Sequence, residues 1–260
     1  MKAAIQPGSA IRRSISLPVS SLPPQRHLLR LPCCLSHPGP NHFTSNRLCH
    51  QKRPVHKERR LAQAMPSRES AGHANGQRKV GVLFVCLGNI CRSPTAEAMF
   101  KAVVKTAGLE DAFDIDSCGT GGGNEDWFLK GGWSYHEGED ADRRMAAIAK
   151  QRGVILTSKS RPLQPLDLDC FDYIIGMEGK NMKEMTKAIN YWRDLYDIPE
   201  DYMSRMSLMT QYCSRYKVNG VPDPYYAEGP DEQAAFNTVL DLLEDACVGL
   251  LEHIKKDKQL

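Results

Sequence analysis

The chain has 260 residues, which is enough for one large domain or two small ones. Its formal net charge of +3 hides two regions of opposite sign: residues 1–79 carry 14 Lys and Arg against 2 acidic residues, and residues 80–260 carry 20 against 29. No stretch reaches the ~20 apolar residues that cross a bilayer, and the nine cysteines form neither a C-x-x-C pair nor a zinc-ligand spacing. A helical membrane protein and a structural zinc site are therefore not indicated.

The basic region at the start of the chain is rich in Ser, Pro, Arg and Leu, as in "RRSISLPVSSLPPQRHLLRLP" at 12–32, and its first acidic residue is Glu58. This composition is typical of an organelle transit peptide. We therefore expect residues 1–78 to be a disordered extension that directs the protein to the chloroplast. The mitochondrion is the alternative, and the protein is cytoplasmic if the extension is not a targeting signal. A solvated basic tail that touches nucleic acid is the other interpretation, but the acidic remainder offers no matching surface, so no nucleic-acid partner is expected.

The region after this extension begins with a strand and a helix. "KVGVLFVC" (79–86) is a short apolar, β-branched run of the kind that is buried in parallel sheets. In "SPTAEAMFKAVVKTAG" (93–108) apolar residues recur at helical spacing. Ser93 is expected as the N-cap, Pro94 as the first helical residue and Gly108 as the residue past the end.

Strands and helices continue to alternate through the rest of the chain. "FDIDSCGT" (113–120) predicts a second strand, and the glycine-rich segment 119–138 predicts a surface loop. The sequence then predicts a helix at 140–153 closed by Gly153, a strand at 171–177, a helix near 180–190, a fourth strand at 206–213 and a long amphipathic helix at 231–256. Because such alternation implies βαβ units, we expect a single α/β domain over 79–260, with three layers and a four-stranded parallel twisted sheet flanked by helices.

The stretch "VCLGNICRS" (85–93) joins the first strand to the first helix. Ligands bind beyond the carboxyl ends of parallel strands, and Cys86 stands at such an end. Successive N–H groups of a loop that enters a helix form a site for anions. Gly88 gives the backbone freedom, Asn89 tolerates a left-handed conformation, and the planar guanidinium of Arg92 fits phosphate oxygens. We therefore predict a phosphate-binding loop made of Leu87, Gly88, Asn89, Ile90, Cys91 and Ser93.

Cys86 would lie in the positive field of this loop. Such surroundings favour the thiolate, the nucleophilic form of cysteine, and the Ser93 hydroxyl is placed to donate a hydrogen bond to it. A thiolate at the base of a phosphate site can attack phosphorus and form a phosphocysteine. The residues thus indicate covalent phosphoryl transfer. No metal and no cofactor is expected, because Arg92, the loop amides and the helix terminus supply the positive charge.

The segment "VLFVCLGNICRSPTAEAMF" (82–100) resembles the active-site segment of the low-molecular-weight protein tyrosine phosphatases. The similarity continues in "DSCGT" (116–120), "FDYIIGM" (171–177) and "VPDPYY" (221–226), and so extends over the whole domain. The resemblance implies that Cys86 is the nucleophile, that Arg92 binds phosphate and stabilises the transition state, and that Asp223 protonates the leaving phenolate and then activates water. It also implies phosphotyrosine-containing protein substrates.

The resemblance assigns supporting residues as well. Ser93, Asn89 and Ser117 match the hydrogen-bonding residues that hold the loop in this family, and Ser158 stands where many members carry His. Ile90 stands where members that act on phosphoarginine carry Thr, which favours phosphotyrosine.

The substrate pocket implied by the family has two aromatic walls. Tyr225 and Tyr226 match the residues of one wall, which suit a flat phenyl ring. The opposite wall is displaced by about a dozen extra residues after "DSCGT". Tyr135 aligns best with the opposing aromatic, and Trp127 or Trp133 is the alternative.

Cys91 matches a second loop cysteine of the family, which suggests a reversible Cys86–Cys91 disulfide that protects the nucleophile from over-oxidation. A packing role is the other interpretation.

Two further functions stay open: an arsenate reductase on the same fold, which needs two more cysteines close together, and a catalytically silent phosphotyrosine-binding module. No membrane partner is expected, and the motifs leave the oligomeric state open, with a monomer expected.

Overall fold

A computed structural model describes residues 78–260, so the predicted extension, apart from Arg78, lies outside the described residues. The centre is a sheet of β1 (Val80–Cys86), β2 (Phe113–Gly119), β3 (Tyr173–Gly176) and β4 (Met206–Leu208). The strand order is β2-β1-β3-β4, and every pair is parallel. The predicted four-stranded parallel sheet is therefore confirmed.

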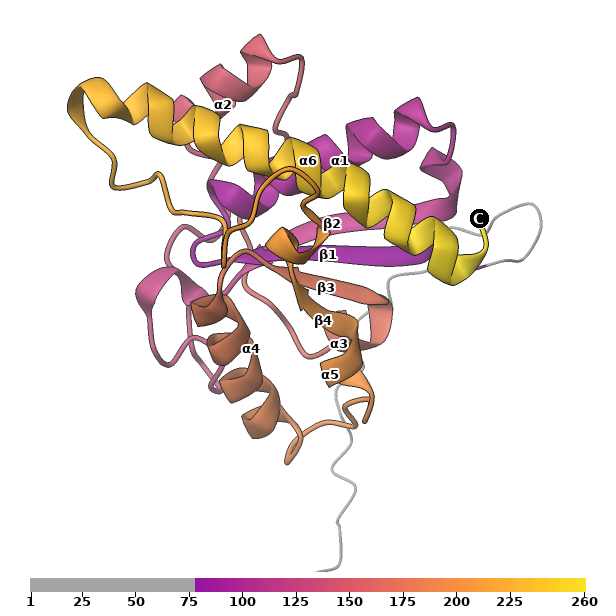
Figure 1. Ribbon diagram of the computed structural model, residues 1–260. Coiled ribbons are helices and arrows are strands. Elements are labelled where there is room, and N and C mark those ends of the chain that lie inside the picture. The colour runs from indigo at the N-terminus through magenta and orange to yellow at the C-terminus, as the bar shows by residue number, and fades with distance from the viewer. Residues whose placement is uncertain (1–77) are drawn as a thin grey trace, which may run out of the picture. The chain divides into compact units, whose positions relative to one another are not determined.

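Helices cover both faces of the sheet (Figure 1). One face carries α1 (Arg92–Thr106), α2 (Arg143–Gln151) and α6 (Glu232–Lys258), and the other carries α3 (Asp167–Cys170), α4 (Gly179–Trp192) and α5 (Tyr202–Arg205). Short 3-10 helices occupy Glu110–Ala112, Gly121–Gly123, Met209–Tyr212 and Gly229–Asp231. The predicted three-layer arrangement is confirmed. Among the helices of residues 78–260, none combines the length and the apolar content that a membrane crossing needs.

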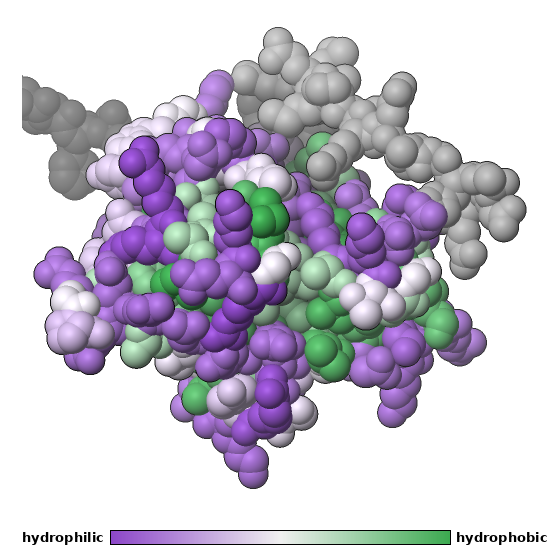
Figure 2. All heavy atoms as spheres, turned by 90° about the horizontal axis from the view of Figure 1, so that it is seen from above, coloured by the Kyte–Doolittle hydropathy of each residue, from purple (hydrophilic) through white to green (hydrophobic). Residues whose placement is uncertain are grey.

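The central strand explains the layering. Every residue of β1 is buried, as expected for a strand with neighbours on both edges and helices on both faces. Val82 and Phe84 belong to the core under α1 and α6, whereas Leu83 and Val85 belong to the core over α4. The outer surface of the α1, α2 and α6 layer is mostly hydrophilic, with smaller hydrophobic patches (Figure 2).

Several predicted boundaries shift by a few residues, and two of these differences have a clear physical reason. Helix α1 begins at Arg92 with Cys91 as the N-cap, so Ser93 lies inside the first turn, where its hydroxyl contacts Cys86 instead of capping the helix. The fourth strand ends at Leu208, because the chain then turns into the 3-10 helix Met209–Tyr212 packed against α6. Gly249 permits this approach, since a Cβ there would lie 2.0 Å from the Tyr212 carbonyl oxygen.

The segment 119–138 is only partly a surface loop. Trp127 and Phe128 are buried, with Trp127 4 % exposed, and their rings pack edge-on against Trp192 and Tyr191 of α4. The Trp192 Nε1 donates a hydrogen bond to the Phe128 carbonyl at 2.9 Å. Segment 119–138, which holds the extra residues after "DSCGT" and is called the insertion below, is therefore fixed to α4 through the hydrophobic core on that face of the sheet.

Candidate active site

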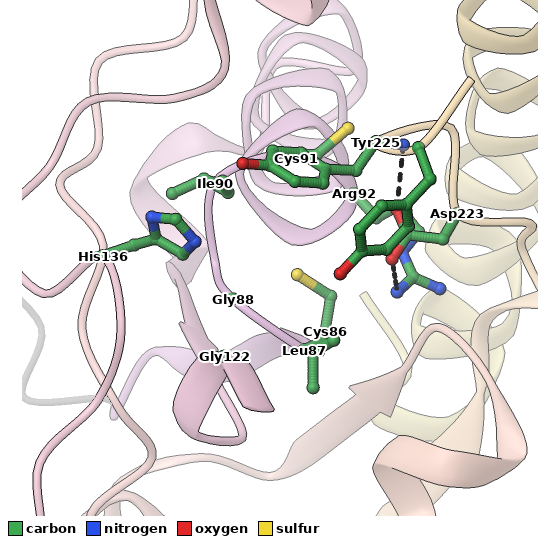
Figure 3. A pocket seen from close by; sticks show the side chains of 11 residues that line it. Cys86, Leu87, Gly88, Ile90, Cys91, Arg92, Gly122, His136, Asp223 and Tyr225 are labelled. Atoms are coloured by element: carbon green, nitrogen blue, oxygen red, sulfur yellow. Dashed lines mark hydrogen bonds and ion pairs between the residues drawn. The ribbon is translucent and has the colours of Figure 1, made fainter. Parts of the chain in front are cut away.

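The carboxyl end of β1 opens into a pocket that the loop at 87–91 surrounds (Figure 3). Asn89 has a φ of 53°, the left-handed conformation predicted for it. The pocket is lined by Cys86, Leu87, Gly88, Ile90, Cys91, Arg92, Gly122, His136, Asp223, Tyr225 and Tyr226. The predicted nucleophile, phosphate-binding arginine and acid thus meet in one pocket.

Two donors converge on the sulfur of Cys86, whose side chain is buried. The Ser93 hydroxyl donates to Sγ at 3.0 Å, and the backbone N–H of Asn89 donates at 3.3 Å. Both hydrogen bonds fix the position of the sulfur in the pocket that the loop surrounds.

Arg92 is buried and forms ion pairs with two acidic side chains. Its Nη1 lies 2.7 Å from Glu178 Oε1 and donates to the Val221 carbonyl at 3.1 Å, and its Nη2 lies 2.7 Å from Asp223 Oδ2. Burial lowers the pKa of Arg92, but the nearby Cys86, Asp223 and Glu178 outweigh it and raise the pKa above its ordinary value. Within residues 78–260 these contacts use three of the five guanidinium donors, which leaves two for phosphate oxygens.

Asn89 holds the loop through its side chain. Its Nδ2 donates to Ser93 Oγ and to Ser117 Oγ, both at 2.9 Å, and its Oδ1 accepts from the backbone N–H of Arg161 at 2.9 Å. The Ser117 hydroxyl in turn donates to Glu97 Oε2 at 2.6 Å. The structure therefore places Ser93, Asn89 and Ser117 in the supporting positions predicted for them.

Ser158 is not the residue that supports the loop. The contact comes from Ser160, whose hydroxyl donates to the Gly88 carbonyl at 2.9 Å. Backbone hydrogen bonds of Ser160 with Gly138 and Glu139, and of Arg161 with Gly119, hold this segment against the loop only from residue 160 onward. Ser158 precedes that segment.

Tyr225 and His136 line the pocket side by side (Figure 3), and their rings meet edge-on with centroids 6.3 Å apart. Tyr226, which is 75 % exposed, also lines the pocket. Tyr135 and its alternatives Trp127 and Trp133 do not line it, so the predictions for the opposing wall are wrong. Trp127 is taken up by the hydrophobic cluster on α4. Tyr135 is half-exposed beside Trp133, and the backbone then turns through His136 at φ 68°, which brings the imidazole to the wall.

Arg144, which the sequence analysis did not single out, joins the two halves of the pocket. Its guanidinium donates to the Tyr225 carbonyl at 2.9 Å and lies 5.5 Å from the centroid of the Tyr225 ring. Its carboxylate partner Asp142 caps α2, and the Asp142 backbone N–H donates to the Ile90 carbonyl at 2.6 Å. The start of α2 therefore connects the acid-bearing loop at 221–226 to the phosphate loop.

Glu178 and His136 were also missed. The position of Glu178 could have been inferred from the sequence, because this residue follows β3 at the same edge of the sheet as Cys86. No sequence pattern indicated His136, because its position depends on the path of the chain through segment 119–138.

The cysteines near the pocket bear on the arsenate reductase alternative. Among the described cysteines, Cys86 and Cys91 line the pocket. Cys118 belongs to the core between the sheet and α4, where complete burial raises the pKa of its thiol. No pair of further cysteines in residues 78–260 stands beside the nucleophile, as a disulfide relay would need. Across the same residues, no group of three or more His, Cys, Asp or Glu side chains is placed to hold a metal ion.

Comparison with known proteins agrees with this site. The family model for low molecular weight phosphotyrosine protein phosphatases matches residues 81–260. A putative low molecular weight protein-tyrosine-phosphatase of Synechocystis is 37 % identical over 176 residues, which cover 68 % of this chain and 97 % of that protein. YfkJ of Bacillus subtilis, a low molecular weight protein-tyrosine-phosphatase, is 35 % identical over 181 residues, which cover 70 % of this chain and 99 % of YfkJ. The chain belongs to the low molecular weight phosphotyrosine protein phosphatase family.

Solved structures share the fold. The crystal structure of a protein tyrosine phosphatase from Entamoeba histolytica is 38 % identical and superposes with a TM-score of 0.58, covering 69 % of this chain and 99 % of that one. The crystal structure of a Drosophila arginine phosphatase is 29 % identical and superposes with a TM-score of 0.54, covering 67 % of this chain and 97 % of that one. The same fold therefore occurs in relatives named for two different phosphorylated residues.

Proposed function

We propose that this enzyme hydrolyses phosphotyrosine in proteins through a phosphocysteine intermediate. The observation that carries the proposal is the meeting of Cys86, Arg92 and Asp223 in one pocket, with the acid bonded to the arginine. A nucleophile, an oxyanion-binding cation and a proton donor are the three groups that this reaction needs.

The first half-reaction transfers the phosphoryl group to the enzyme. The phosphate of the substrate sits against the loop amides and the two remaining donors of Arg92. Cys86 Sγ attacks phosphorus, the S–P bond forms, and the bond from phosphorus to the phenolic oxygen breaks. Because the phenolate is a poor leaving group, with a conjugate-acid pKa of about 10, it takes a proton from the Asp223 carboxyl as it departs.

The second half-reaction restores the enzyme. The Asp223 carboxylate takes a proton from a water molecule, whose oxygen attacks phosphorus. The S–P bond then breaks, inorganic phosphate leaves, and the Cys86 thiolate is free again. Asp223 can serve both steps, since Arg92 holds its carboxylate in the pocket that Cys86 also lines.

The walls of the pocket support an aryl substrate. Tyr225, Tyr226 and His136 line the pocket, and aromatic side chains of this kind pack favourably against the ring of an aryl phosphate. Ile90 lies in the wall, at the position that favours phosphotyrosine over phosphoarginine. Peptides that differ only in carrying phosphotyrosine or phosphoarginine separate the two substrate classes directly.

The experiment is hydrolysis of p-nitrophenyl phosphate and of a phosphotyrosine peptide by the full-length chain without added metal. Cys86→Ser is expected to abolish turnover and Asp223→Asn to reduce it strongly. Tight binding of the peptide by the wild-type chain without any turnover would instead support the silent binding module.

Redox control of the nucleophile is a further part of the proposal. Hydrogen peroxide would oxidise the Cys86 thiolate to a sulfenic acid, and the Cys91 thiol would condense with it, forming a disulfide and releasing water. The two cysteines line the same pocket. Burial raises the pKa of the Cys91 thiol, so Cys91 stays protonated and Cys86 is the site of first oxidation.

We also propose that the basic region 1–78 targets the protein to the chloroplast, on the evidence of its composition. A fluorescent protein fused behind residues 1–78 should enter the organelle, and a fusion to residues 79–260 should not. The protein is proposed to act as a monomer on phosphoprotein substrates, which analytical ultracentrifugation tests.

A further inference from the structure

Two aromatic side chains of the insertion are exposed beside the pocket. Trp133 is 52 % exposed and Tyr135 is 48 % exposed, and their ring centroids lie 4.4 Å apart. Large aromatic side chains exposed as a pair are typical of surfaces that bind a partner.

The loop that presents this aromatic pair is tightly held. Asn124 Nδ2 donates to the Trp133 carbonyl at 2.6 Å, and Asn124 Oδ1 accepts from the Asp126 N–H at 3.2 Å. Gly132 packs so closely that a Cβ there would lie 2.4 Å from the Asp126 carbonyl oxygen. The rings are thus presented by a preorganised turn, which reduces the entropy that binding would cost.

The aromatic pair is continuous with the active-site pocket. Tyr135 precedes the pocket residue His136, and its N–H donates to the Gly121 carbonyl at 3.2 Å. Its Cβ lies against Gly122, another pocket residue, where an added Cβ would approach to 2.7 Å. The aromatic pair therefore borders the pocket beside Gly122 and His136, within reach of the residues next to a bound phosphotyrosine.

The charges around the pair are mostly negative. Exposed carboxylates come from Glu125 and Asp126 on one side of the loop and from Glu137, Glu139 and Asp140 on the other. Glu139 is bonded to His136 and Asp140 to Lys159, while Lys130 lies within the segment and Lys187 donates to the Glu125 carbonyl. Segment 121–140 carries five acidic residues against one lysine, so the rim favours a positive ligand.

We propose that Trp133 and Tyr135, with the carboxylates around them, bind an arginine or lysine side chain that flanks the phosphotyrosine of the substrate. The inference rests on the proposed function and specifies its substrate class. A guanidinium stacks on the face of an indole or phenol ring, and the nearby carboxylates attract its charge. The extra residues of this chain thereby select basic phosphotyrosine sequences.

The test compares phosphotyrosine peptides that are identical except for Arg, Leu, Ala or Glu next to the phosphotyrosine. With the full-length enzyme, kcat/KM for the Arg peptide should exceed that for the Ala peptide by about threefold to fivefold. Trp133→Ala should bring this ratio close to one, and Trp133→Lys should bring it below one. Tyr196→Ala, which removes an aromatic ring that is 49 % exposed on another part of the surface, is the matched control and should leave the ratio unchanged.

Three results would overturn the inference: equal rates for the Arg and Ala peptides, a Leu peptide that matches the Arg peptide, or an Arg preference that survives in both Trp133 variants. Absence of turnover with every peptide would contradict the proposed function instead. In that case, binding of the Arg and Ala peptides to Cys86→Ser, measured by calorimetry, decides whether the rim prefers a cation.

Discussion

Arg92 Nη2 lies 2.7 Å from Asp223 Oδ2, so the phosphate-binding residue and the proton donor of the reaction are bonded to each other. The contact fixes the position of the carboxylate in the pocket that Cys86 also lines. It also means that a phosphate dianion in the pocket shares Arg92 with Asp223.

Replacing Asp223 separates its two effects. Asp223→Asn should lower kcat for phosphotyrosine by about 10²–10⁴-fold, because the phenolate then leaves without a proton. Inorganic phosphate should inhibit this variant more strongly than wild type, since the carboxylate that competes for Arg92 is gone. Steady-state kinetics with phosphate as the inhibitor measures both. Glu228→Gln, an exposed acid on the same loop, is the control. An unchanged kcat would remove Asp223 from the mechanism.

Glu178→Gln tests the second carboxylate on Arg92. Glutamine can still accept the hydrogen bond that caps α4, so the variant removes charge while keeping the cap. Losing the ion pair with the buried arginine should cost about 1–3 kcal/mol in the free energy of unfolding and should lower kcat/KM, because Arg92 is less firmly oriented. Urea denaturation and kinetics measure the two effects. Wild-type values for both would show that Asp223 alone holds the guanidinium.

Asn89 supports the loop by its backbone conformation and by its side chain, and two variants separate these contributions. Asn89→Gly keeps the left-handed backbone, whereas Asn89→Ala adds about 1 kcal/mol of strain. Both variants lose the bonds to Ser93 and Ser117 and should show a lower kcat, with the alanine variant also less stable than the glycine variant. Equal stability of the two would contradict the role assigned to φ.

We expect the Asp142 carboxyl to make a pH-dependent contribution to the free energy of unfolding. Burial raises the pKa of its carboxyl, but hydrogen bonds from Arg144 and from the backbone at the start of α2 lower the pKa by more than burial raises it. The net pKa therefore lies below the ordinary value. Its stabilising effect is therefore complete above the unfolded pKa of about 3.9 and is lost as the pH falls through the lower folded value. Asp142→Asn should be less stable than wild type by roughly 1–2 kcal/mol at pH 7.

The difference between Asp142→Asn and wild type should shrink below about pH 4, as thermal unfolding across pH can measure. Asp140→Asn, at an exposed carboxylate two residues earlier, serves as the control. A difference that stays constant down to pH 2 would contradict the assignment.

Cys91→Ser tests redox protection. Peroxide should inactivate wild type and the variant alike, because both retain Cys86, and dithiothreitol should restore only wild type, since the variant cannot form the protective disulfide. Activity after treatment with peroxide and then reductant is the measurement. Recovery of the variant to the wild-type level would reject the disulfide.

The sheet, its flanking helices and the phosphate loop could all be predicted from the sequence because their signals are local. The β1 run, the left-handed Asn89 and the glycines after α1 and α2 act within a few residues of themselves. Cys86 and Arg92 are brought together by the same short loop, and Asp223 could be placed because its motif matches that of the family.

The pocket wall could not be predicted, because it depends on contacts between distant segments. Trp127 enters the cluster on α4 only because α4 offers Trp192 and a bare backbone at Gly121 lies under its ring. Once Trp127 is buried there, the rest of the insertion brings His136, and not Tyr135, to the pocket beside Tyr225. Ser160 replaces Ser158 for a similar reason, since backbone pairing with 138–139 fixes which serine reaches Gly88.

The most direct test of the account is to look for the phosphocysteine itself. The full-length chain is mixed with p-nitrophenyl phosphate, quenched in acid during turnover, and analysed by mass spectrometry of its peptides. The account predicts one phosphoryl group on Cys86, present in wild type and absent from Cys86→Ser. Turnover with no phosphoryl group on Cys86 at any time, or with the group on another residue, would contradict it.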